Sequence, residues 1–289
     1  MTETPFRPRR SALYLPAANA RALEKARALA CDAVIIDLED SVAPEAKAAA
    51  REAAVAAVKA GGFGRRELVV RVNGLDTPYG EADLKAMAEA GPDAVLAPKI
   101  TDAGDVARYD SRLSHAPATT RLWVMIETAR CLFHLDGIGA AARTSRLSCM
   151  VMGLNDLAKE TGARLTPARE AFAPALALSV AAARAHGVAI LDGVFADLED
   201  EAGFIAECEQ GAIFGFDGKT VIHPRQVGPC NRVFSPSPEA LADARAVIEA
   251  FAAPANQGKG AIRVGGRMAE HLHLVQAERL VAMAGGLEE

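Results

Sequence analysis

Eight short apolar runs alternate with eight segments of helical type, and this alternation predicts an α/β protein built as a (β/α)8 barrel (TIM barrel) with a C-terminal helical extension. Nearly every apolar run is also followed by polar or charged residues, and in a barrel these run ends meet at one face. A doubly wound open sheet is the alternative. Its first turn is usually rich in glycine, whereas here that turn reads Leu15-Pro16-Ala17-Ala18-Asn19.

The predicted strands are short runs that suit burial on both faces, as in a parallel sheet. They are residues 12–15, 33–38, 68–72, 94–97, 122–126, 147–152, 188–191 and 220–222. The predicted helices are residues 21–30, 44–60, 81–90, 103–113, 131–142, 167–186, 200–210 and 224–233. We therefore expect residues 1–234 to form a catalytic barrel and residues 235–289 to form the extension.

The extension begins with a breaker, Ser235-Pro236-Ser237-Pro238, which is followed by a predicted helix over about 239–251. Residues 252–260 are small and polar with two glycines, so we expect a mobile loop there. Helical spacing returns over 268–283. Because the extension lies outside the eight-unit count, it must cap its own barrel or reach a neighbouring subunit.

Composition argues against nucleic-acid and membrane partners. The 289 residues are 51% hydrophobic and 24% charged, with a net charge of −5. No apolar run reaches the ~18 residues of a membrane span, and residues 2–10 do not resemble a signal peptide. The five cysteines form no CxxC pair, which favours buried free thiols in a reducing compartment. We expect a cytoplasmic protein.

Charged residues at strand ends predict a metal site. Glu127 follows the strand over 122–126, and Asp156 follows the strand over 147–152. Two carboxylates at the ends of neighbouring strands are suitable ligands for Mg²⁺. Arg71 lies within an apolar strand, where a guanidinium needs an anionic partner.

Seven motifs in order resemble one family. They are Ala33-Val-Ile-Ile-Asp-Leu-Glu-Asp-Ser-Val-Ala-Pro, Val70-Arg-Val-Asn-Gly, Ala97-Pro-Lys, Met125-Ile-Glu-Thr, Gly153-Leu-Asn-Asp-Leu, Gly218-Lys-Thr-Val-Ile-His-Pro and Gly266-Arg-Met. The chain resembles the citrate lyase β-subunit-like (CitE-like) CoA-ester lyases and the malyl-CoA and citramalyl-CoA lyases of the HpcH/HpaI aldolase superfamily. The resemblance covers most of the chain.

The resemblance implies a Mg²⁺-dependent carbon–carbon lyase that works as a homotrimer or homohexamer. Such an enzyme cleaves a β-hydroxyacyl-CoA of the malyl-, citramalyl- or citryl-CoA type to an acyl-CoA and a 2-oxo acid, by retro-Claisen or aldol chemistry. Glu127 and Asp156 match the metal ligands, and Arg71 matches the arginine that holds the oxo-acid carboxylate. A structural ion pair at the strand ends is the alternative for the two acids, and a structural pair with Glu39 or Asp40 is the alternative for Arg71. Glu39 and Asp40 match the residues that bind metal-bound waters, although a helix cap and a surface charge are their alternative roles.

The acid/base position departs from the family pattern. The lyases usually carry an aspartate in the C-terminal motif, and this chain has Glu270 there. Its extra methylene moves the carboxyl by more than about an ångström, and misplacement on that scale can cost ~100-fold in rate. Glu270 is therefore either a relocated catalytic acid/base or a sign of altered chemistry such as thioester hydrolysis.

For the CoA phosphates we expect basic side chains near the open face of the barrel: Arg10, Arg21, Lys25 and Lys99. Each has a solvated surface charge as its alternative. His223, within the Ile-His-Pro motif, is interpreted as structural or site-lining rather than as a general base.

Other functions fit the same sequence. An acyl-CoA thioesterase or a malate-synthase-like condensing enzyme would use the same scaffold and metal. A free 2-oxo-acid aldolase usually has a histidine base after an early strand, and this chain has no histidine before His115. A non-catalytic partner subunit is the alternative of another class, and the intact Arg71, Glu127 and Asp156 argue against it.

Overall fold

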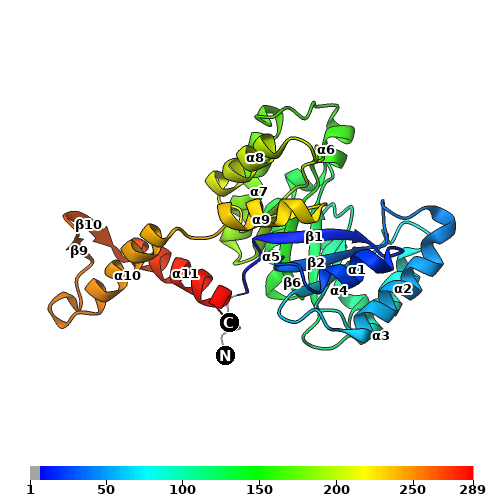
Figure 1. Cartoon of the computed structure of the whole chain (residues 1–289), viewed down its shortest axis with the longest axis horizontal. Helices are drawn as coiled ribbons and strands as arrows, with labels where there is room; N and C mark the ends of the chain where they lie inside the picture. Colours follow the sequence, from blue (N-terminus) through cyan, green and yellow to red (C-terminus); the bar gives the residue numbers. More distant parts are fainter. Residues whose placement is uncertain (1–6, 289) are drawn as a thin grey trace. The chain divides into compact units, whose positions relative to one another are not determined.

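A computed structural model describes residues 7–288 of the chain, with side chains up to residue 284 (Figure 1). The polar N-terminal segment considered above comprises residues 2–10, and residues 2–6 of it lie outside the described residues. By its internal contacts the chain divides into two compact units, residues 9–232 and residues 233–288 together with residues 7–8.

The first unit is a closed barrel of eight parallel strands, so the predicted fold class is confirmed. The strands are β1 (Ser11–Pro16), β2 (Ala33–Asp37), β3 (Glu67–Arg71), β4 (Ala94–Ala97), β5 (Arg121–Ile126), β6 (Leu147–Met152), β7 (Ala189–Asp192) and β8 (Gly218–Val221). Each pairs with the next, and β8 pairs with β1. All eight predicted strands are present, with ends within two residues of their expected positions.

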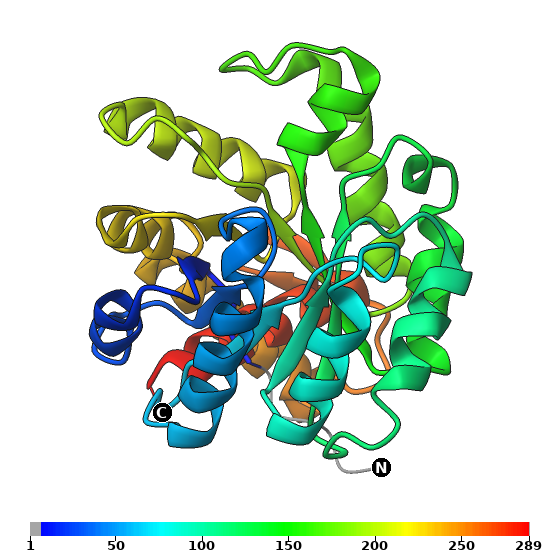
Figure 2. The ribbon, with the colours of Figure 1, turned by 90° about the vertical axis from the view of Figure 1, so that its right-hand side faces the viewer.

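Helices surround the strands as an outer ring (Figure 2). The α-helices are α1 (Ala20–Ala26), α2 (Lys47–Ala60), α3 (Gly80–Ala90), α4 (Ala103–Arg112), α5 (Leu135–Ala140), α6 (Leu154–Thr161), α7 (Ala173–Ala185), α8 (Glu201–Phe214) and α9 (Pro224–Val233). The 3-10 turns are η1 (Pro44–Ala46), η2 (Cys131–Phe133), η3 (Ala141–Arg143) and η4 (Glu170–Phe172).

Local chemistry explains several helix ends. Asp102 caps α4 by accepting hydrogen bonds from the N–H groups of Gly104 and Asp105. His223 precedes α9, and its Nδ1 accepts a hydrogen bond from the N–H of Arg225, which supports a structural role.

The structure differs from the predicted helices at two places. The single helix predicted over 131–142 is divided into η2, α5 and η3. The helix α6 was not predicted.

The barrel interior is a packed core of small and apolar side chains, including Ile35, Leu96, Trp123 and Val151. At the N-terminal ends of the strands, Arg9 lies over the Trp123 ring at 5.1 Å and pairs with Glu67 through an Nε–Oε2 distance of 2.7 Å. An ion pair therefore closes the barrel at the N-terminal ends of its strands. A cavity can then open at the C-terminal ends.

A buried ion network joins β7 and β8 to the surrounding helices. Asp192 at the end of β7 contacts Arg169 Nη1 at 2.8 Å and Lys219 Nζ at 3.0 Å. Lys219 also contacts Glu207 of α8 at 2.6 Å. The side chains of Arg169, Asp192 and Lys219 are almost completely buried. Two acids and two bases thus balance one another inside the protein.

The second unit contains α10 (Pro238–Ala252), η5 (Pro254–Asn256), β9 (Ala261–Val264), β10 (Arg267–Glu270) and α11 (His271–Glu288). One expectation was wrong here, because residues 268–270 of the expected helix belong to β10. Residues 254–256 of the expected loop form a 3-10 turn, and the mobility of this loop stays a prediction. Gly265 and Gly266 both have positive φ, 55° and 82°, which is the backbone of a tight hairpin turn between β9 and β10.

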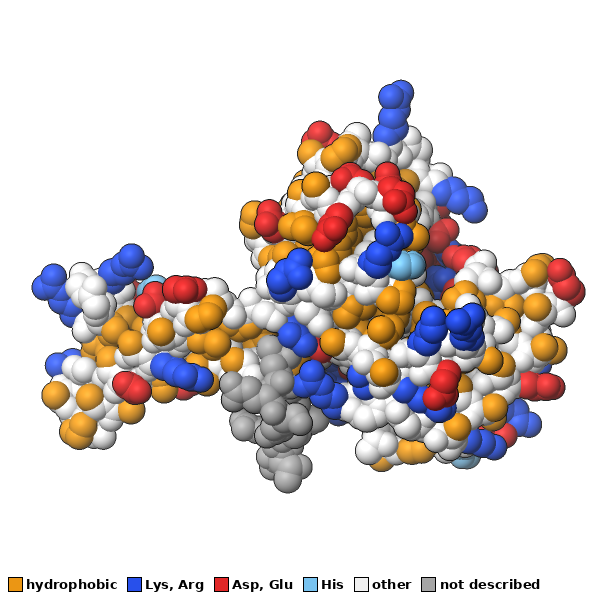
Figure 3. Space-filling model, in the orientation of Figure 1, with side chains coloured by type: hydrophobic (Ala, Val, Ile, Leu, Met, Phe, Trp, Pro, Cys, Tyr) orange, Lys and Arg blue, Asp and Glu red, His pale blue; other side chains and the backbone are white. Residues whose placement is uncertain are grey.

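The second unit exposes large hydrophobic side chains. Met268, Leu272 and Val275 are 68%, 52% and 63% exposed. Figure 3 shows hydrophobic side chains spread over α10 and α11 on the face that it presents. Exposure on this scale is typical of a surface that contacts another protein.

All five cysteines of the chain are free and buried, as expected. None of the helices in the described part of the chain is long and apolar enough to cross a membrane.

Candidate active site

A cavity of about 440 Å³ opens at the C-terminal ends of the barrel strands. Its lining combines charged and apolar side chains. The charged side chains are Asp37, Asp40, Arg71, Glu127 and Asp156, and the apolar ones include Tyr14, Leu15, Met125, Met152, Leu154, Val194 and Ile222. A cavity with this lining can hold a ligand that has an anionic end and an apolar body.

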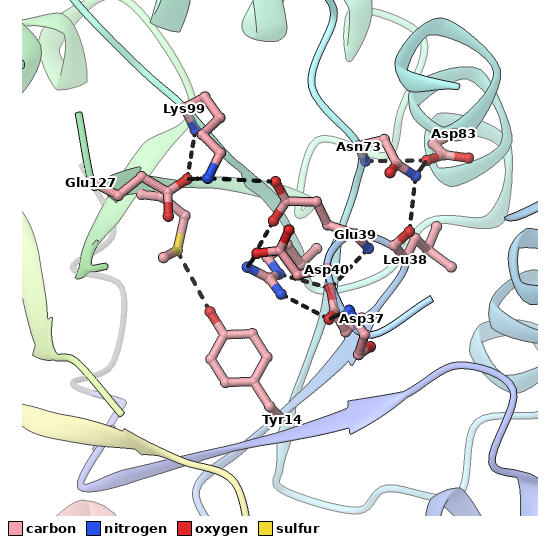
Figure 4. Close-up of polar contacts among 12 residues, drawn as sticks. Tyr14, Asp37, Leu38, Glu39, Asp40, Asn73, Asp83, Lys99 and Glu127 are labelled. Atoms are coloured by element: carbon pink, nitrogen blue, oxygen red, sulfur yellow. Dashed lines mark hydrogen bonds and ion pairs between the residues drawn. The ribbon is translucent and has the colours of Figure 1, made fainter. Parts of the chain in front are cut away.

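Arg71 ends β3 and is held by three carboxylates (Figure 4). Its Nε and Nη2 each donate to one oxygen of Asp37 at 2.7 Å. Its Nη1 lies 2.7 Å from Glu39 Oε2 and 3.5 Å from Asp40 Oδ2. The Tyr14 ring lies 5.1 Å from the guanidinium carbon, which adds a cation–π contact.

Glu127 lies directly beyond β5 and is almost completely buried. Its Oε1 accepts a hydrogen bond from the backbone N–H of Lys99 at 2.8 Å. Gly153 makes room for it, because a Cβ at that position would lie 2.5 Å from Glu127 Cβ and 2.6 Å from Oε2. Burial raises the pKa of the Glu127 carboxyl, although the nearby Lys99 ammonium acts in the opposite direction.

Asp156 belongs to the first turn of α6 rather than to the end of β6, which stops at Met152. The short α6 starts at Leu154, and its first turn brings the carboxylate to the cavity. Asp156 Oδ2 lies 2.7 Å from Lys99 Nζ. The structure therefore brings Glu127 and Asp156 to the same cation, which is the ammonium group of Lys99.

Negative charge exceeds positive charge in this cluster. It contains five carboxylates (Asp37, Glu39, Asp40, Glu127 and Asp156) and two cations (Arg71 and Lys99). Burial raises the pKa of Glu39 to about 8, against the opposing effect of Arg71. Glu39 Oε2 is close to Arg71 but accepts no hydrogen bond from the described residues. An excess of carboxylates over cations fits a divalent cation and its waters.

No group of three or more His, Cys, Asp or Glu side chains is arranged as a metal site among residues 7–288. Two carboxylates are nevertheless enough for Mg²⁺, which usually retains several waters and takes one or two protein carboxylates. Glu127 and Asp156 are the residues that could hold it, and the expected role of Glu39 toward its waters stays a prediction. The donor set thus fits the expected cofactor.

The basic residues expected to bind CoA phosphates are distributed differently. Arg10 precedes β1 at the opposite end of the barrel, where its guanidinium pairs with Asp32 through Nε–Oδ2 and Nη2–Oδ1 distances of 2.8 Å, so its position does not support the expected role. Lys99 contacts the carboxylate cluster instead. Arg21 and Lys25 are exposed on α1, and neither lines the cavity.

Glu270 is the last residue of β10 in the second unit. Its N–H donates to His273 Nδ1 at 2.9 Å, and His271 packs on the Phe251 ring at 5.3 Å. Both neighbouring histidines therefore have partners within this unit. The acid/base role of Glu270 stays a prediction.

Comparison with known proteins identifies the family of this chain. The model of one family, described as HpcH/HpaI aldolase/citrate lyase, matches residues 10–224. The chain belongs to this family. The family match covers the whole barrel from β1 to β8, including all residues of the cavity.

Individual relatives of the family differ in their reactions. The chain is 47% identical over 277 residues to a (3S)-malyl-CoA thioesterase from Cereibacter sphaeroides, covering 96% of this chain and 95% of that protein. It is 36% identical over 306 residues to an L-malyl-CoA/beta-methylmalyl-CoA lyase from the same species, covering 97% and 96%.

One solved structure of the family contains the expected kinds of ligand. It is the protein CitE from Mycobacterium tuberculosis in complex with magnesium, acetoacetate and coenzyme A. Its TM-score is 0.76 and its sequence identity is 31%, over 96% of this chain and 98% of that chain.

Sequence reasoning missed three residues of this family site. Asp37 and Tyr14 contact Arg71 directly, and Lys99 was assigned to another ligand. For Asp37 a signal was available, because the last residues of adjacent parallel strands face the same cavity. For Lys99 there was none, since a flexible side chain of four carbons can reach several partners.

Proposed function

We propose that this protein is a Mg²⁺-dependent enzyme that acts on β-hydroxyacyl-CoA thioesters of the malyl-CoA type. The observation that carries the proposal is the convergence of Arg71, Glu127 and Asp156 on one cavity at the open end of the barrel. The guanidinium can hold the carboxylate of the malyl end, and Mg²⁺, which the two acids would hold, would supply a Lewis acid beside it. The malyl-CoA relatives support this choice of substrate.

Each residue of the site has a proposed role in binding. Arg71 binds the substrate carboxylate through Nη1, which Asp37 does not contact and which lies 2.7 Å from Glu39 Oε2 in the absence of substrate. Glu127 and Asp156 hold Mg²⁺, and Glu39 and Asp40 bind its waters. When bound, Mg²⁺ supplies a Lewis acid that stabilises negative charge on the substrate oxygen.

Two reactions can follow from this binding mode. In hydrolysis, water attacks the thioester carbonyl, the new C–O bond replaces the C–S bond, and the thiolate leaves and takes up a proton. In carbon–carbon cleavage, a base removes the hydroxyl proton, the C–C bond breaks, and the acyl-CoA enolate takes up a proton to give acyl-CoA and a 2-oxo acid. Glu270 is the proposed proton-transfer group in both reactions.

We place hydrolysis first, because the identity to the thioesterases is 47% against 36% to the lyases. The glutamate at position 270, where the lyases it resembles usually have aspartate, favours the same choice. The lyase reaction, which the sequence suggested first, is the second candidate.

The assembly is proposed to be a cytoplasmic homotrimer or homohexamer in which the second unit contacts a neighbouring subunit. The exposed Met268, Leu272 and Val275 support such a contact, since they offer an apolar surface. The mass of the assembly in solution, measured by light scattering, tests the proposed number of subunits.

Arg21 and Lys25 are the remaining candidates for binding the CoA phosphates.

A substrate panel tests the proposed function. The protein is given malyl-CoA, citramalyl-CoA, β-methylmalyl-CoA and citryl-CoA with Mg²⁺, and free thiol and 2-oxo acid are measured separately. Thiol without oxo acid supports hydrolysis, and oxo acid without thiol supports the lyase. Glu127→Gln is the matched control, and it should be inactive in either case. Absence of both products would contradict the proposal and favour a partner-dependent subunit.

A further inference from the structure

The ammonium group of Lys99 lies among the carboxylates of the proposed metal site (Figure 4). Its Nζ is 2.7 Å from Asp156 Oδ2, 3.7 Å from Glu127 Oε1 and 4.0 Å from Glu39 Oε1. These three acids follow three different strands of the barrel, β2, β5 and β6. Lys99 is thus the one side chain of the described cluster that bridges both proposed metal ligands.

The backbone is shaped to place Lys99 there. Its φ is 54°, and only Lys99 and Arg169 among the described non-glycine residues have a positive φ. A residue with a Cβ is disfavoured in this left-handed region, so a surrounding constraint must hold it. One such constraint is its own N–H, which donates to Glu127 Oε1 at 2.8 Å. The same turn therefore fixes the carboxylate and directs the ammonium group.

The contacts of the ammonium group are easily broken. Only the contact with Asp156 is within hydrogen-bond distance, and the Lys99 side chain is 33% exposed. A lysine on a flexible stem with one short contact can move into solvent. By contrast, the buried Lys219 has two contacts of 3.0 Å or less and no exposed surface.

We propose that Lys99 is an exchangeable counter-cation of the metal site, which competes with Mg²⁺ for the carboxylates of Glu127 and Asp156. Metal binding then displaces the ammonium group from Asp156. Without a divalent ion, Lys99 offsets part of the excess negative charge of the cluster. The inference rests on the proposed function only in taking Glu127 and Asp156 as the metal ligands.

The test is Mn²⁺ binding to the full-length protein after treatment with EDTA, followed by the electron paramagnetic resonance signal of free Mn²⁺ and without substrate. Lys99→Met removes the charge and keeps the length of the side chain, while Lys99→Arg keeps the charge. Lys159→Met is the matched control, because Lys159 is an exposed lysine of α6 and its loss changes the net charge equally.

Lys99→Met should tighten Mn²⁺ binding roughly five- to thirty-fold, the factor that corresponds to a lost competing contact of 1–2 kcal/mol. Lys159→Met and Lys99→Arg should stay within about threefold of the unmodified protein by the same scale. Unchanged or weaker binding by Lys99→Met would overturn the inference. Weaker binding would mean that the ammonium group assists the metal.

Thermal unfolding gives a second readout. In EDTA, Lys99→Met should unfold at a lower temperature than the unmodified protein, because its carboxylates lose a counter-charge. With saturating Mn²⁺ this difference should shrink, since the variant that binds the metal more tightly gains more stability from it, by RT ln(1 + c/Kd) at free metal concentration c. A difference that is the same with and without Mn²⁺ contradicts competition. If Lys99→Met does not fold, Lys99→Gln takes its place in both measurements.

The outcomes separate this inference from the proposed function. If the unmodified protein binds Mn²⁺ and consumes a malyl-CoA-type thioester but Lys99→Met binds no tighter, the function stands and the competition is wrong. If Lys99→Met binds tighter but no thioester is consumed, the competition stands and the proposed function is wrong. If the unmodified protein binds no Mn²⁺, both are wrong.

Discussion

Asp37 and Arg71 occupy the last positions of two adjacent strands in register, and their side chains form a bidentate pair with both N–O distances at 2.7 Å. The pair fixes the plane of the guanidinium and leaves its Nη1 directed at Glu39 and the cavity. The Arg71 guanidinium holds the pKa of the Asp37 carboxyl below its usual value, against the opposing effect of burial. Asp37 is therefore a positioning residue for the arginine that we expect to bind substrate.

Asp37→Asn should lower kcat/KM by roughly 10- to 100-fold, the usual cost of removing a group that orients a ligand residue. The neutral amide cannot accept both N–H donors, so Arg71 loses its fixed orientation. Steady-state kinetics with the preferred thioester would show the loss chiefly in KM. Asp136→Asn is the control, since Asp136 is 90% exposed and does not line the cavity, and it should change kcat/KM little. Equal effects of the two variants would contradict this role for Asp37.

Gly153→Ala should weaken metal binding by roughly 10- to 100-fold, because the new methyl group would displace the Glu127 carboxylate. The backbone of Gly153 has φ −117°, which alanine can adopt, so the effect should be steric and local. Isothermal titration with Mg²⁺ measures the affinity. Gly137→Ala is the control, because its Cβ would meet no atom closer than 4.0 Å. Unaltered affinity in Gly153→Ala would argue against Glu127 as a ligand.

Glu270→Ala should reduce kcat by roughly 100-fold or more if this residue transfers the proton, which is the usual size of general acid–base catalysis. Glu270→Asp distinguishes a relocated catalytic acid/base from altered chemistry such as thioester hydrolysis. If it raises oxo-acid release relative to thiol release, the length of the side chain determines the reaction. Product ratios in the substrate panel provide the measurement. Full activity of Glu270→Ala would remove it from the mechanism.

Asp192→Asn should destabilise the protein by about 3–5 kcal/mol at neutral pH, because it leaves buried cations without their partner. Burial acts to raise the pKa of Asp192, but Lys219 and Arg169 hold it below its usual value. Its contribution is therefore present above the unfolded carboxyl pKa and is lost as pH falls through the lower folded value.

Thermal unfolding between pH 7 and pH 3 measures this dependence. The unmodified protein should lose more stability on acidification than Asp192→Asn, since the variant lacks this carboxylate. Glu199→Gln removes an exposed pair with Arg225 and should change little at any pH. Parallel curves for the unmodified protein and Asp192→Asn would show that the network does not depend on this charge.

The barrel was predictable because its strands are buried on both faces and read as short apolar runs, and the parallel arrangement then sends every run end to one face. The positions of Arg71 and Glu127 at that face follow from this geometry, whereas Asp156 reaches it through the first turn of α6, which was not predicted. The contacts of Lys99 could not be predicted, because they depend on a left-handed backbone and on side-chain reach rather than on any pattern.

The hairpin of β9 and β10 was missed for a different reason. Its strands have four residues each, too few for alternation to be recognised against the helical spacing that follows. The Gly265-Gly266 pair was the available signal, since two adjacent residues with positive φ favour a two-residue turn.

The burial of all five cysteines bears on how the enzyme can be assayed. A chromogenic thiol reagent reacts only with accessible sulfur atoms, so the native protein should add almost no background absorbance, while released coenzyme A reacts at once. If the absorbance instead rises with protein concentration when no thioester is present, the cysteines have become accessible because the protein is unfolding. The same reagent can therefore follow turnover in folded enzyme and the integrity of each variant before it is tested.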